Sequence, residues 1–188
     1  MSNLPDPIDT LPTPNPNALM FKVAQELVSE GTYEYRNRGS AKGSPLPQLL
    51  FGLDGVEQVL VTRQYVTINK ADHYSWSDLV PAIKGLIREH ISTGEIAVAP
   101  KEENDLDKSG DSELAQAISG LIDSQVRPAV AMDGGDIEFI RLTPDNVVEV
   151  RLIGACSTCP SSTATLAMGI ETLIVEEFPE VVGVEQVF

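Results

Sequence analysis

An acidic and almost entirely polar segment divides this chain and constrains its fold more than any other feature. Residues 101–113 carry two basic and six acidic side chains, a net charge of 2 − 6 = −4, and Leu106 is their only apolar residue. Such a segment cannot bury the apolar surface that folding requires. The sequence therefore predicts one domain over residues 1–97, a flexible acidic linker over 98–111 and a second domain over 112–188. The alternative is a long loop inside a single domain, which is uncommon in compact proteins.

The overall charge excludes several classes of partner. The chain has 188 residues and a formal net charge of −15. Residues 114–188 contribute 3 − 11 = −8 of that charge. An acidic surface repels phosphate backbones and anionic lipid headgroups, so we expect neither nucleic acid nor a membrane as a partner. No apolar run approaches the ~20 residues needed to span a bilayer.

The N-terminal residues and the cysteine count indicate a cytoplasmic protein. The first residues contain neither a basic segment followed by an apolar one nor the Arg-rich amphipathic pattern of an organellar transit peptide. Two cysteines cannot form a disulfide framework, which favours a reducing compartment. Hydrophobic residues make up 42% of the chain, enough to form a buried core.

Residues 1–97 alternate between short β-type and helical patterns. We expect Ser75, with Asp78 three residues on, to begin the longer helix, and Leu49 and Leu50 to point inward from the shorter one. These patterns predict a small α+β domain with helices on one side of a sheet. The expected strands are 18–23, 32–35, 56–61 and 64–68, and the expected helices are 45–53 and 76–91.

The second domain shows clearer periodicity. An apolar stripe over residues 114–126 predicts a helix that ends before Pro128. The predicted order is α-β-β-α-β, a second α+β domain. After the first helix and a turn at 132–136, we expect strands over 137–142 and 147–153, a helix over 160–178 and a last strand over 181–188.

Cys156 and Cys159 are the only cysteines, and they lie three residues apart. Pro160 suits the first position of a helix, where its missing N–H has no cost. We therefore expect both thiols at a helix N-terminus. The free N–H groups and positive dipole end there favour thiolate, the form that binds metals and attacks disulfides.

Four interpretations of this pair remain open. They are two unrelated cysteines, a thioredoxin-like redox motif, a zinc site and an iron–sulfur site. A redox motif is typical after the first strand of a βαβ unit, whereas a hairpin is predicted to precede these cysteines. Zinc and iron–sulfur sites usually need four protein ligands, and His73 and His90, in the other domain, are interpreted as ordinary surface or helix residues. Two sulfurs per chain then imply a site shared across a symmetric dimer.

Several motifs resemble a known family. Residues 132–136 (Met-Asp-Gly-Gly-Asp), followed by residues 154–162 (Gly-Ala-Cys-Ser-Thr-Cys-Pro-Ser-Ser), resemble the C-terminal domain of NifU-like (Nfu) proteins, and residues 13–17 (Thr-Pro-Asn-Pro-Asn) with the stretch after them resemble the Nfu-type N-terminal domain. The resemblance implies an iron–sulfur cluster scaffold or carrier rather than an enzyme. It implies that Cys156 and Cys159 ligate a [4Fe–4S] cluster bridging two subunits; a [2Fe–2S] cluster also accepts four thiolates.

The resemblance also implies partners. These are upstream cluster-assembly proteins, apoprotein recipients of the cluster, and a second copy of the chain when the cluster is bound. A thiol–disulfide oxidoreductase remains the alternative function.

Because residues 114–188 are acidic, we expect chains without a cluster to stay monomeric at low salt. Asp133 and Asp136 are interpreted as turn and strand-start residues rather than a metal or acid–base pair.

Overall fold

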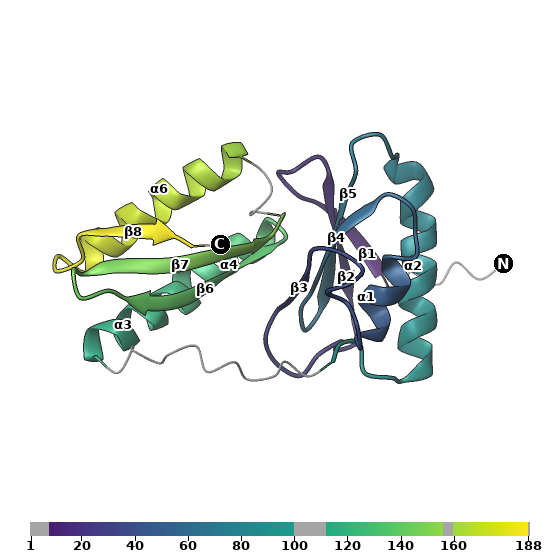
Figure 1. Cartoon of the computed structure of the whole chain (residues 1–188), viewed down its shortest axis with the longest axis horizontal. Coiled ribbons are helices and arrows are strands. Elements are labelled where there is room, and N and C mark those ends of the chain that lie inside the picture. Colours follow the sequence, from purple (N-terminus) through teal and green to yellow (C-terminus); the bar gives the residue numbers. More distant parts are fainter. Residues whose placement is uncertain (1–7, 100–111, 156–159, 188) are drawn as a thin grey trace. The chain divides into compact units, whose positions relative to one another are not determined.

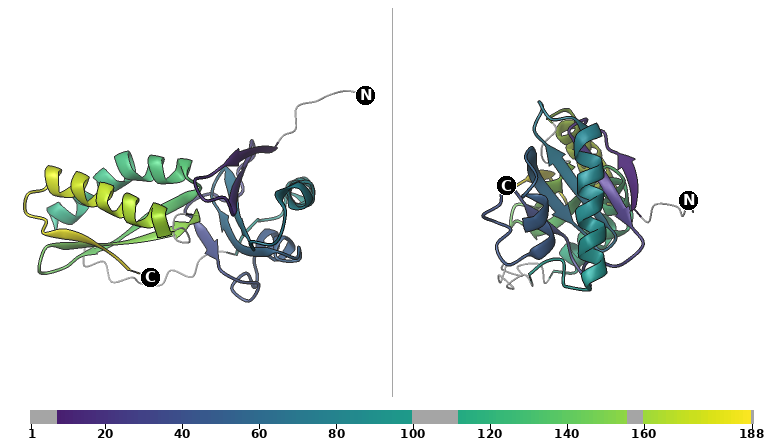
Figure 2. Two further views of the ribbon diagram at one scale, coloured as in Figure 1. Left: turned by 90° about the horizontal axis from the view of Figure 1, so that it is seen from above. Right: turned by 90° about the vertical axis from the view of Figure 1, so that its right-hand side faces the viewer.

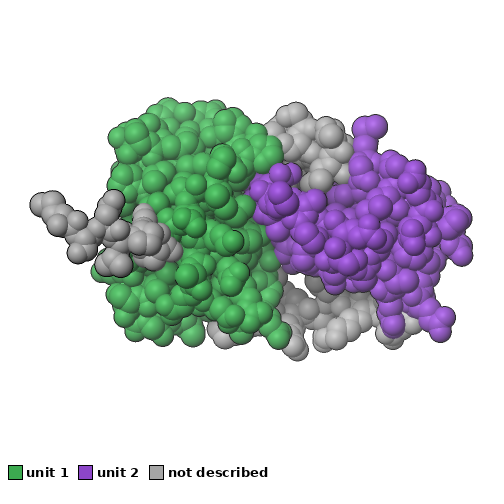
Figure 3. All heavy atoms as spheres, turned by 180° about the vertical axis from the view of Figure 1, so that it is seen from behind, with its two compact units in different colours: residues 1–100 green, residues 101–188 purple. Residues whose placement is uncertain are grey.

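The structure, a computed structural model, describes residues 8–99, 112–155 and 160–187, without the side chains of 160–167. The chain forms two compact units, unit 1 over residues 1–100 and unit 2 over residues 101–188 (Figure 3). Each unit combines helices with one β-sheet, so the predicted α+β class is confirmed. Most of the predicted linker, 98–111, lies outside the described residues, and its flexibility stays a prediction.

Unit 1 contains a five-stranded antiparallel sheet with the strand order β1-β2-β5-β4-β3 (Figure 1). Among the described strands, β1 pairs with β2 alone, and this edge strand was not predicted from the sequence. The strands are β1 (Ile8–Pro12), β2 (Ala18–Val23), β3 (Tyr33–Tyr35), β4 (Val56–Val61) and β5 (Tyr65–Lys70); the helices are α1 (Pro45–Leu50) and α2 (Trp76–Thr93).

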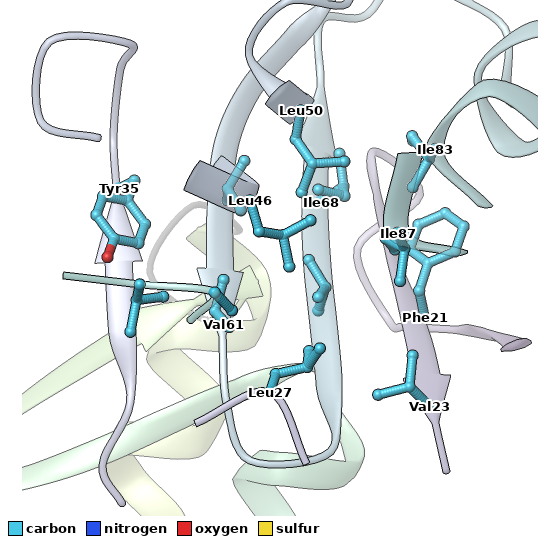
Figure 4. Close-up of a cluster of buried hydrophobic side chains, with 14 of the residues drawn as sticks. Phe21, Val23, Leu27, Tyr35, Leu46, Leu50, Val61, Ile68, Ile83 and Ile87 are labelled. Atoms are coloured by element: carbon cyan, nitrogen blue, oxygen red, sulfur yellow. The ribbon is translucent and has the colours of Figure 1, made fainter. Parts of the chain in front are cut away.

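Both helices of unit 1 pack on one face of this sheet (Figure 1). Figure 4 shows Phe21 of β2 next to Ile83 and Ile87 of α2, and Ile68 of β5 next to Leu50 of α1. Ser75 caps α2 by accepting a hydrogen bond from the backbone N–H of Ser77. Of Leu49 and Leu50, which were both predicted to point inward from α1, only one does.

Leu50 of α1 is fully buried, but Leu49 is 43% exposed. Consecutive residues on a helix point about 100° apart and cannot both face a core on one side. A six-residue helix that packs along one face therefore buries only one of the two leucines.

Unit 2 contains a three-stranded sheet, with helices on one of its faces (Figure 2). Its strand order is β6-β7-β8, and β7 pairs antiparallel with β6 and parallel with β8. Its elements are α3 (Glu113–Leu121), the π-helical turn η1 (Ile122–Val126), α4 (Arg127–Met132), β6 (Gly135–Leu142), β7 (Val147–Gly154), α6 (Pro160–Glu177) and β8 (Gly183–Gln186).

Apolar side chains from both layers of unit 2 form its core. Ile118 and Ile122 from the first helical stretch, Ile137 from β6, and Ile170 and Ile174 from α6 are almost fully buried. No helix in the described parts of either unit has the length and apolar character to cross a bilayer.

The first helical stretch of unit 2 continues past Pro128, so the predicted end before that proline was wrong. In η1 the helix widens, and the backbone N–H of Arg127 donates to the carbonyl of Ile122, five residues back. Proline lacks an N–H and crowds the preceding turn. A π-helical turn accommodates such a residue without ending the helix. Pro128 thereby occupies the first turn of α4.

Candidate functional site

The predicted ligands Cys156 and Cys159 lie outside the described residues, but both ends of their segment are described. β7 ends at Gly154, and the next residue, Ala155, is buried. Pro160 is the first residue of α6, as its position in the sequence predicts. In sequence, the cysteines therefore lie within residues 156–159 (the cysteine segment), between Ala155, which follows β7, and the 18-residue helix α6.

The open end of the β6–β7 hairpin, opposite its 143–146 turn, leads into the cysteine segment. Gly135 pairs with Gly154 across the two strands, and the backbone N–H of Ala155 donates to the carbonyl of Gly134 over 3.3 Å. Gly134 and Gly154 have φ angles of +78° and +75°. This left-handed region is open to glycine at little cost. The glycines of the two motifs therefore allow the chain to turn sharply on both sides of the hairpin end.

A buried ion pair lies at the same end of the hairpin. Asp136 is 4% exposed, and its Oδ1 accepts hydrogen bonds from Nη1 of Arg127 over 2.6 Å and from the backbone N–H of Ile137 over 2.7 Å. Nε and Nη2 of Arg127 also donate to Oδ1 of Asp123, over 3.1 and 2.8 Å. Asp136 is the second residue of β6, close to the strand start expected for it, but its ion pair was missed.

The two carboxylates hold Arg127 in its charged form. Burial alone lowers the pKa of its guanidinium, but the hydrogen bonds and negative charges of Asp123 and Asp136 outweigh burial and raise that pKa above its ordinary value. The scarcity of basic residues is the one sequence signal that could have suggested a partner for these carboxylates. Arg127 is one of only three basic residues in 114–188, and it precedes Asp136 by nine positions.

The set of donors in unit 2 restricts which metals the segment suits. Residues 101–188 contain no histidine and no thiol besides Cys156 and Cys159. Among the residues that the structure describes, no three His, Cys, Asp or Glu side chains are grouped to hold a metal ion. Among thiols and imidazoles, the sequence of unit 2 therefore offers a metal only Cys156 and Cys159.

Both histidines belong to unit 1. The ring of the exposed His73 lies against Tyr74, with 4.6 Å between ring centroids. His90, near the end of α2, is 3% exposed, and its Nε2 has no hydrogen-bond partner among the described residues. Burial lowers the pKa of His90 and outweighs the opposite effect of Glu95. His90 also borders a cavity of about 190 Å³, lined in addition by Glu26 and Glu95.

Family models match both halves of the chain. The model described as "Scaffold protein Nfu/NifU N terminal" matches residues 8–94, and the model described as "NifU-like domain" matches residues 118–185. The first covers the described sheet and helices of unit 1. The second covers the hairpin, the cysteine segment, α6 and most of β8.

Similar proteins from plants and flies extend over almost the whole chain. The Arabidopsis thaliana proteins named "NifU-like protein 4, mitochondrial" and "NifU-like protein 5, mitochondrial" are 38% and 37% identical over 186 residues, covering 96% of this chain and 66% and 68% of their own lengths. "NFU1 iron-sulfur cluster scaffold homolog, mitochondrial" from Drosophila willistoni is 36% identical, covering 96% of this chain and 63% of its own. The chain thus spans about two thirds of the length of these relatives.

A solved structure also resembles part of the chain. The solution structure of a NifU-like protein from Saccharomyces cerevisiae is 28% identical, with a TM-score of 0.46, and the match covers 50% of this chain and 85% of that one.

The prediction of a cytoplasmic protein was wrong. It is contradicted by the plant and fly relatives, which are named as mitochondrial proteins. One ground for the prediction was the low number of cysteines. That number excludes a disulfide framework, but it does not distinguish between compartments that lack one.

Proposed function

Because this chain belongs to the Nfu family of NifU-like proteins, we propose that it is a scaffold and carrier of iron–sulfur clusters rather than an enzyme. The family resemblance drawn from its sequence motifs is confirmed. In this proposal Cys156 and Cys159 of two subunits together bind one [4Fe–4S] cluster. Upstream assembly proteins supply the cluster, and apoproteins receive it.

The observation that carries the proposal is the position of the chain's only thiols between the end of β7 and the start of α6. An 18-residue helix presents unpaired N–H groups and a positive dipole end at its first turn. Both favour thiolate over thiol nearby. Two thiolates per chain supply half of the four that a cluster usually takes, so a symmetric pair of chains completes the site.

The number of ligands per subunit also supports a carrier rather than a permanent redox centre. Each subunit holds the cluster through only two sulfur ligands. Separation of the subunits, or replacement of one subunit's thiolates by those of a recipient, then releases the cluster. The cluster is therefore cargo that the protein passes on, not a resident cofactor.

One observation favours a second candidate, a thiol–disulfide oxidoreductase. β7, α6 and β8 form a βαβ unit with parallel strands, and the cysteine pair falls between its first strand and its helix. A thioredoxin-like Cys-x-x-Cys motif occupies this position as well. The sequence predicted the hairpin, the helix and the last strand, but not the parallel pairing of that last strand with β7 that makes this likeness visible.

Anaerobic reconstitution with iron and sulfide tests the proposal. We expect about four iron and four sulfide ions per two chains and the broad visible absorbance of a thiolate-bound cluster. The double variant Cys156→Ser, Cys159→Ser should bind none. His73→Ala, which removes an exposed imidazole from the other unit, is the matched control and should bind as the unaltered chain does.

Two further outcomes separate the candidates. Transfer of the cluster to an apo-ferredoxin or apo-aconitase-type acceptor, faster than from free iron and sulfide, supports the carrier. Retention of the absorbance by the double cysteine variant contradicts the ligand assignment. Catalytic turnover of a disulfide substrate by the monomeric apoprotein, with no cluster bound after reconstitution, replaces the carrier by the oxidoreductase.

A further inference from the structure

The Arg127–Asp136 ion pair joins the first helical stretch of unit 2 to the end of the β6–β7 hairpin. We infer that this pair positions the backbone from which the chain enters the cysteine segment, and so controls how firmly a bound cluster is held. The inference rests on the proposed function. It concerns Arg127 and Asp136 as positioning residues, because neither is a ligand.

The carboxylate of Asp136 is bound at the point where the hairpin ends. Its Oδ1 receives both the guanidinium of Arg127, at 2.6 Å, and the backbone N–H of Ile137, at 2.7 Å. Asp136 pairs with Ile153 across the hairpin, next to the Gly135–Gly154 pair. Ile153 precedes Cys156 by three residues. A shift of this carboxylate therefore moves the strand end that leads directly into the cysteine segment.

The guanidinium of Arg127 is itself held in place from the other side. Nε and Nη2 bind Asp123 one helical turn earlier, and Nη1 is left for Asp136. Planar donors in a fixed fork favour this kind of simultaneous contact. The wide turn η1 lies directly before Arg127 and contains Asp123. The π-helical turn thus carries Asp123, the residue that orients Arg127 toward Asp136.

The burial of Asp136 makes the arrangement stiff. A carboxylate with 6% side-chain exposure is costly without a cation, and removing either partner of such a pair is strongly destabilising. Gly134 and Gly154 on the same hairpin end have positive φ angles and little intrinsic stiffness. The ion pair supplies the rigidity that these glycines lack.

The same hairpin offers a matched control. Arg141 binds Glu149 through two hydrogen bonds of 2.8 and 2.9 Å, and these residues are also cross-strand neighbours. This second ion pair lies toward the 143–146 turn, away from the cysteine segment, and Arg141 is 52% exposed. Removing it also removes an ion pair from the hairpin, but not from the end that leads into the cysteine segment.

The test compares Asp136→Asn with Glu149→Gln. Each variant is reconstituted, and loss of the cluster to a chelator is followed well below the unfolding midpoint. Residues that orient metal ligands contribute about ten- to a hundredfold in metal affinity, so Asp136→Asn should lose the cluster faster by about that factor. Glu149→Gln should match the unaltered chain. In the apoprotein, amide hydrogen exchange at Ala155 should rise only in Asp136→Asn.

Arg127 provides a second route, since its side chain is 39% exposed, whereas that of Asp136 is only 6% exposed. Arg127→Gln should lose the cluster as fast as Asp136→Asn does. Arg127→Lys, which keeps the charge, should lose it more slowly than Arg127→Gln. Equal loss rates for the Asp136 and Glu149 variants, with unchanged exchange at Ala155, overturn the inference. An unaltered chain that binds no cluster would instead refute the proposed function, whatever the exchange at Ala155 shows.

Discussion

Gly55 occupies a backbone position that no other residue fits without strain. Its φ angle is +93°, and a Cβ atom there would lie 2.4–2.7 Å from ring atoms of Tyr74. We predict that Gly55→Ala lowers the free energy of unfolding by about 2–4 kcal/mol, through backbone strain and overpacking. Denaturant unfolding followed by circular dichroism measures this change.

Gly85 is the control for that substitution. It lies inside α2, and a Cβ atom there meets nothing within 4 Å. Gly85→Ala should raise the stability by about 0.5–1 kcal/mol, because alanine favours the helix and restricts the unfolded chain. Similar losses for both variants would contradict the steric account of Gly55.

His90 should make stability depend on pH. Its pKa in the fold is lowered by burial, so as the pH falls below the ordinary histidine value of about 6.5, the unfolded chain binds the proton more readily than the folded one. Stability from this source is present at neutral pH and decreases on acidification. His90→Gln should flatten the decline measured by denaturant unfolding between about pH 7 and pH 5. An unchanged decline in His90→Gln would exclude the buried imidazole as its source.

At the level of single residues, the sequence did not predict contacts that depend on how separate elements pack. The apolar spacing of α2 predicts a face formed by Leu79, Ile83, Leu86 and Ile91. Leu79 and Ile83 are buried, Leu86 and Ile91 are only partly buried, and the buried Ile87 was missed. Asp136 was assigned to a strand start, and its ion pair with Arg127 was not foreseen. Such a pair depends on how a helix lies across a hairpin end, and no local pattern encodes that.

Among the elements, α3 depends on its N-terminal cap. Ser112 Oγ accepts a hydrogen bond from the backbone N–H of Ala115 over 3.1 Å. Ser112→Ala should therefore lower the free energy of unfolding by about 1 kcal/mol. Ser119→Ala, inside the same helix, removes the same hydroxyl group without removing a cap and should be neutral or slightly stabilising. Thermal unfolding of the two variants measures the difference, and equal midpoints would argue against the cap.

Strands and helices with a clear period were predictable, and those decided by tertiary pairing were not. The limits of β2 and β4 match the apolar runs of the sequence. β1 was missed because its five residues form a strand only by pairing with β2 at the sheet edge. The helix through Pro128 was missed because proline normally ends a helix, and only the wide turn η1 removes that conflict.

For the whole molecule, two separate cores predict two separate unfolding events. The core residues of unit 1 and unit 2 form distinct clusters. Ile174→Ala should create a cavity in unit 2 and lower its stability by about 2–5 kcal/mol. Residue-resolved hydrogen exchange should then show faster exchange in β6 and β7 and no change in β4 and β5. A parallel increase in both units would contradict independent domains.

The charge of the whole molecule bears on its assembly. Residues 114–188 carry a net charge of −8, and two such regions repel each other at low salt. A cluster ligated by four thiolates adds negative charge, so its metal–sulfur bonds must overcome this repulsion. We therefore expect the chain to change from monomer to dimer when the cluster binds, and not before.

Native mass spectrometry before and after anaerobic reconstitution tests the central claim most directly. The account predicts a single chain at low salt before reconstitution, and afterwards two chains with one [4Fe–4S] cluster, a species absent from the Cys156→Ser, Cys159→Ser variant. A cluster carried by a single chain, or a loaded dimer that persists in that variant, would contradict a cluster shared through Cys156 and Cys159.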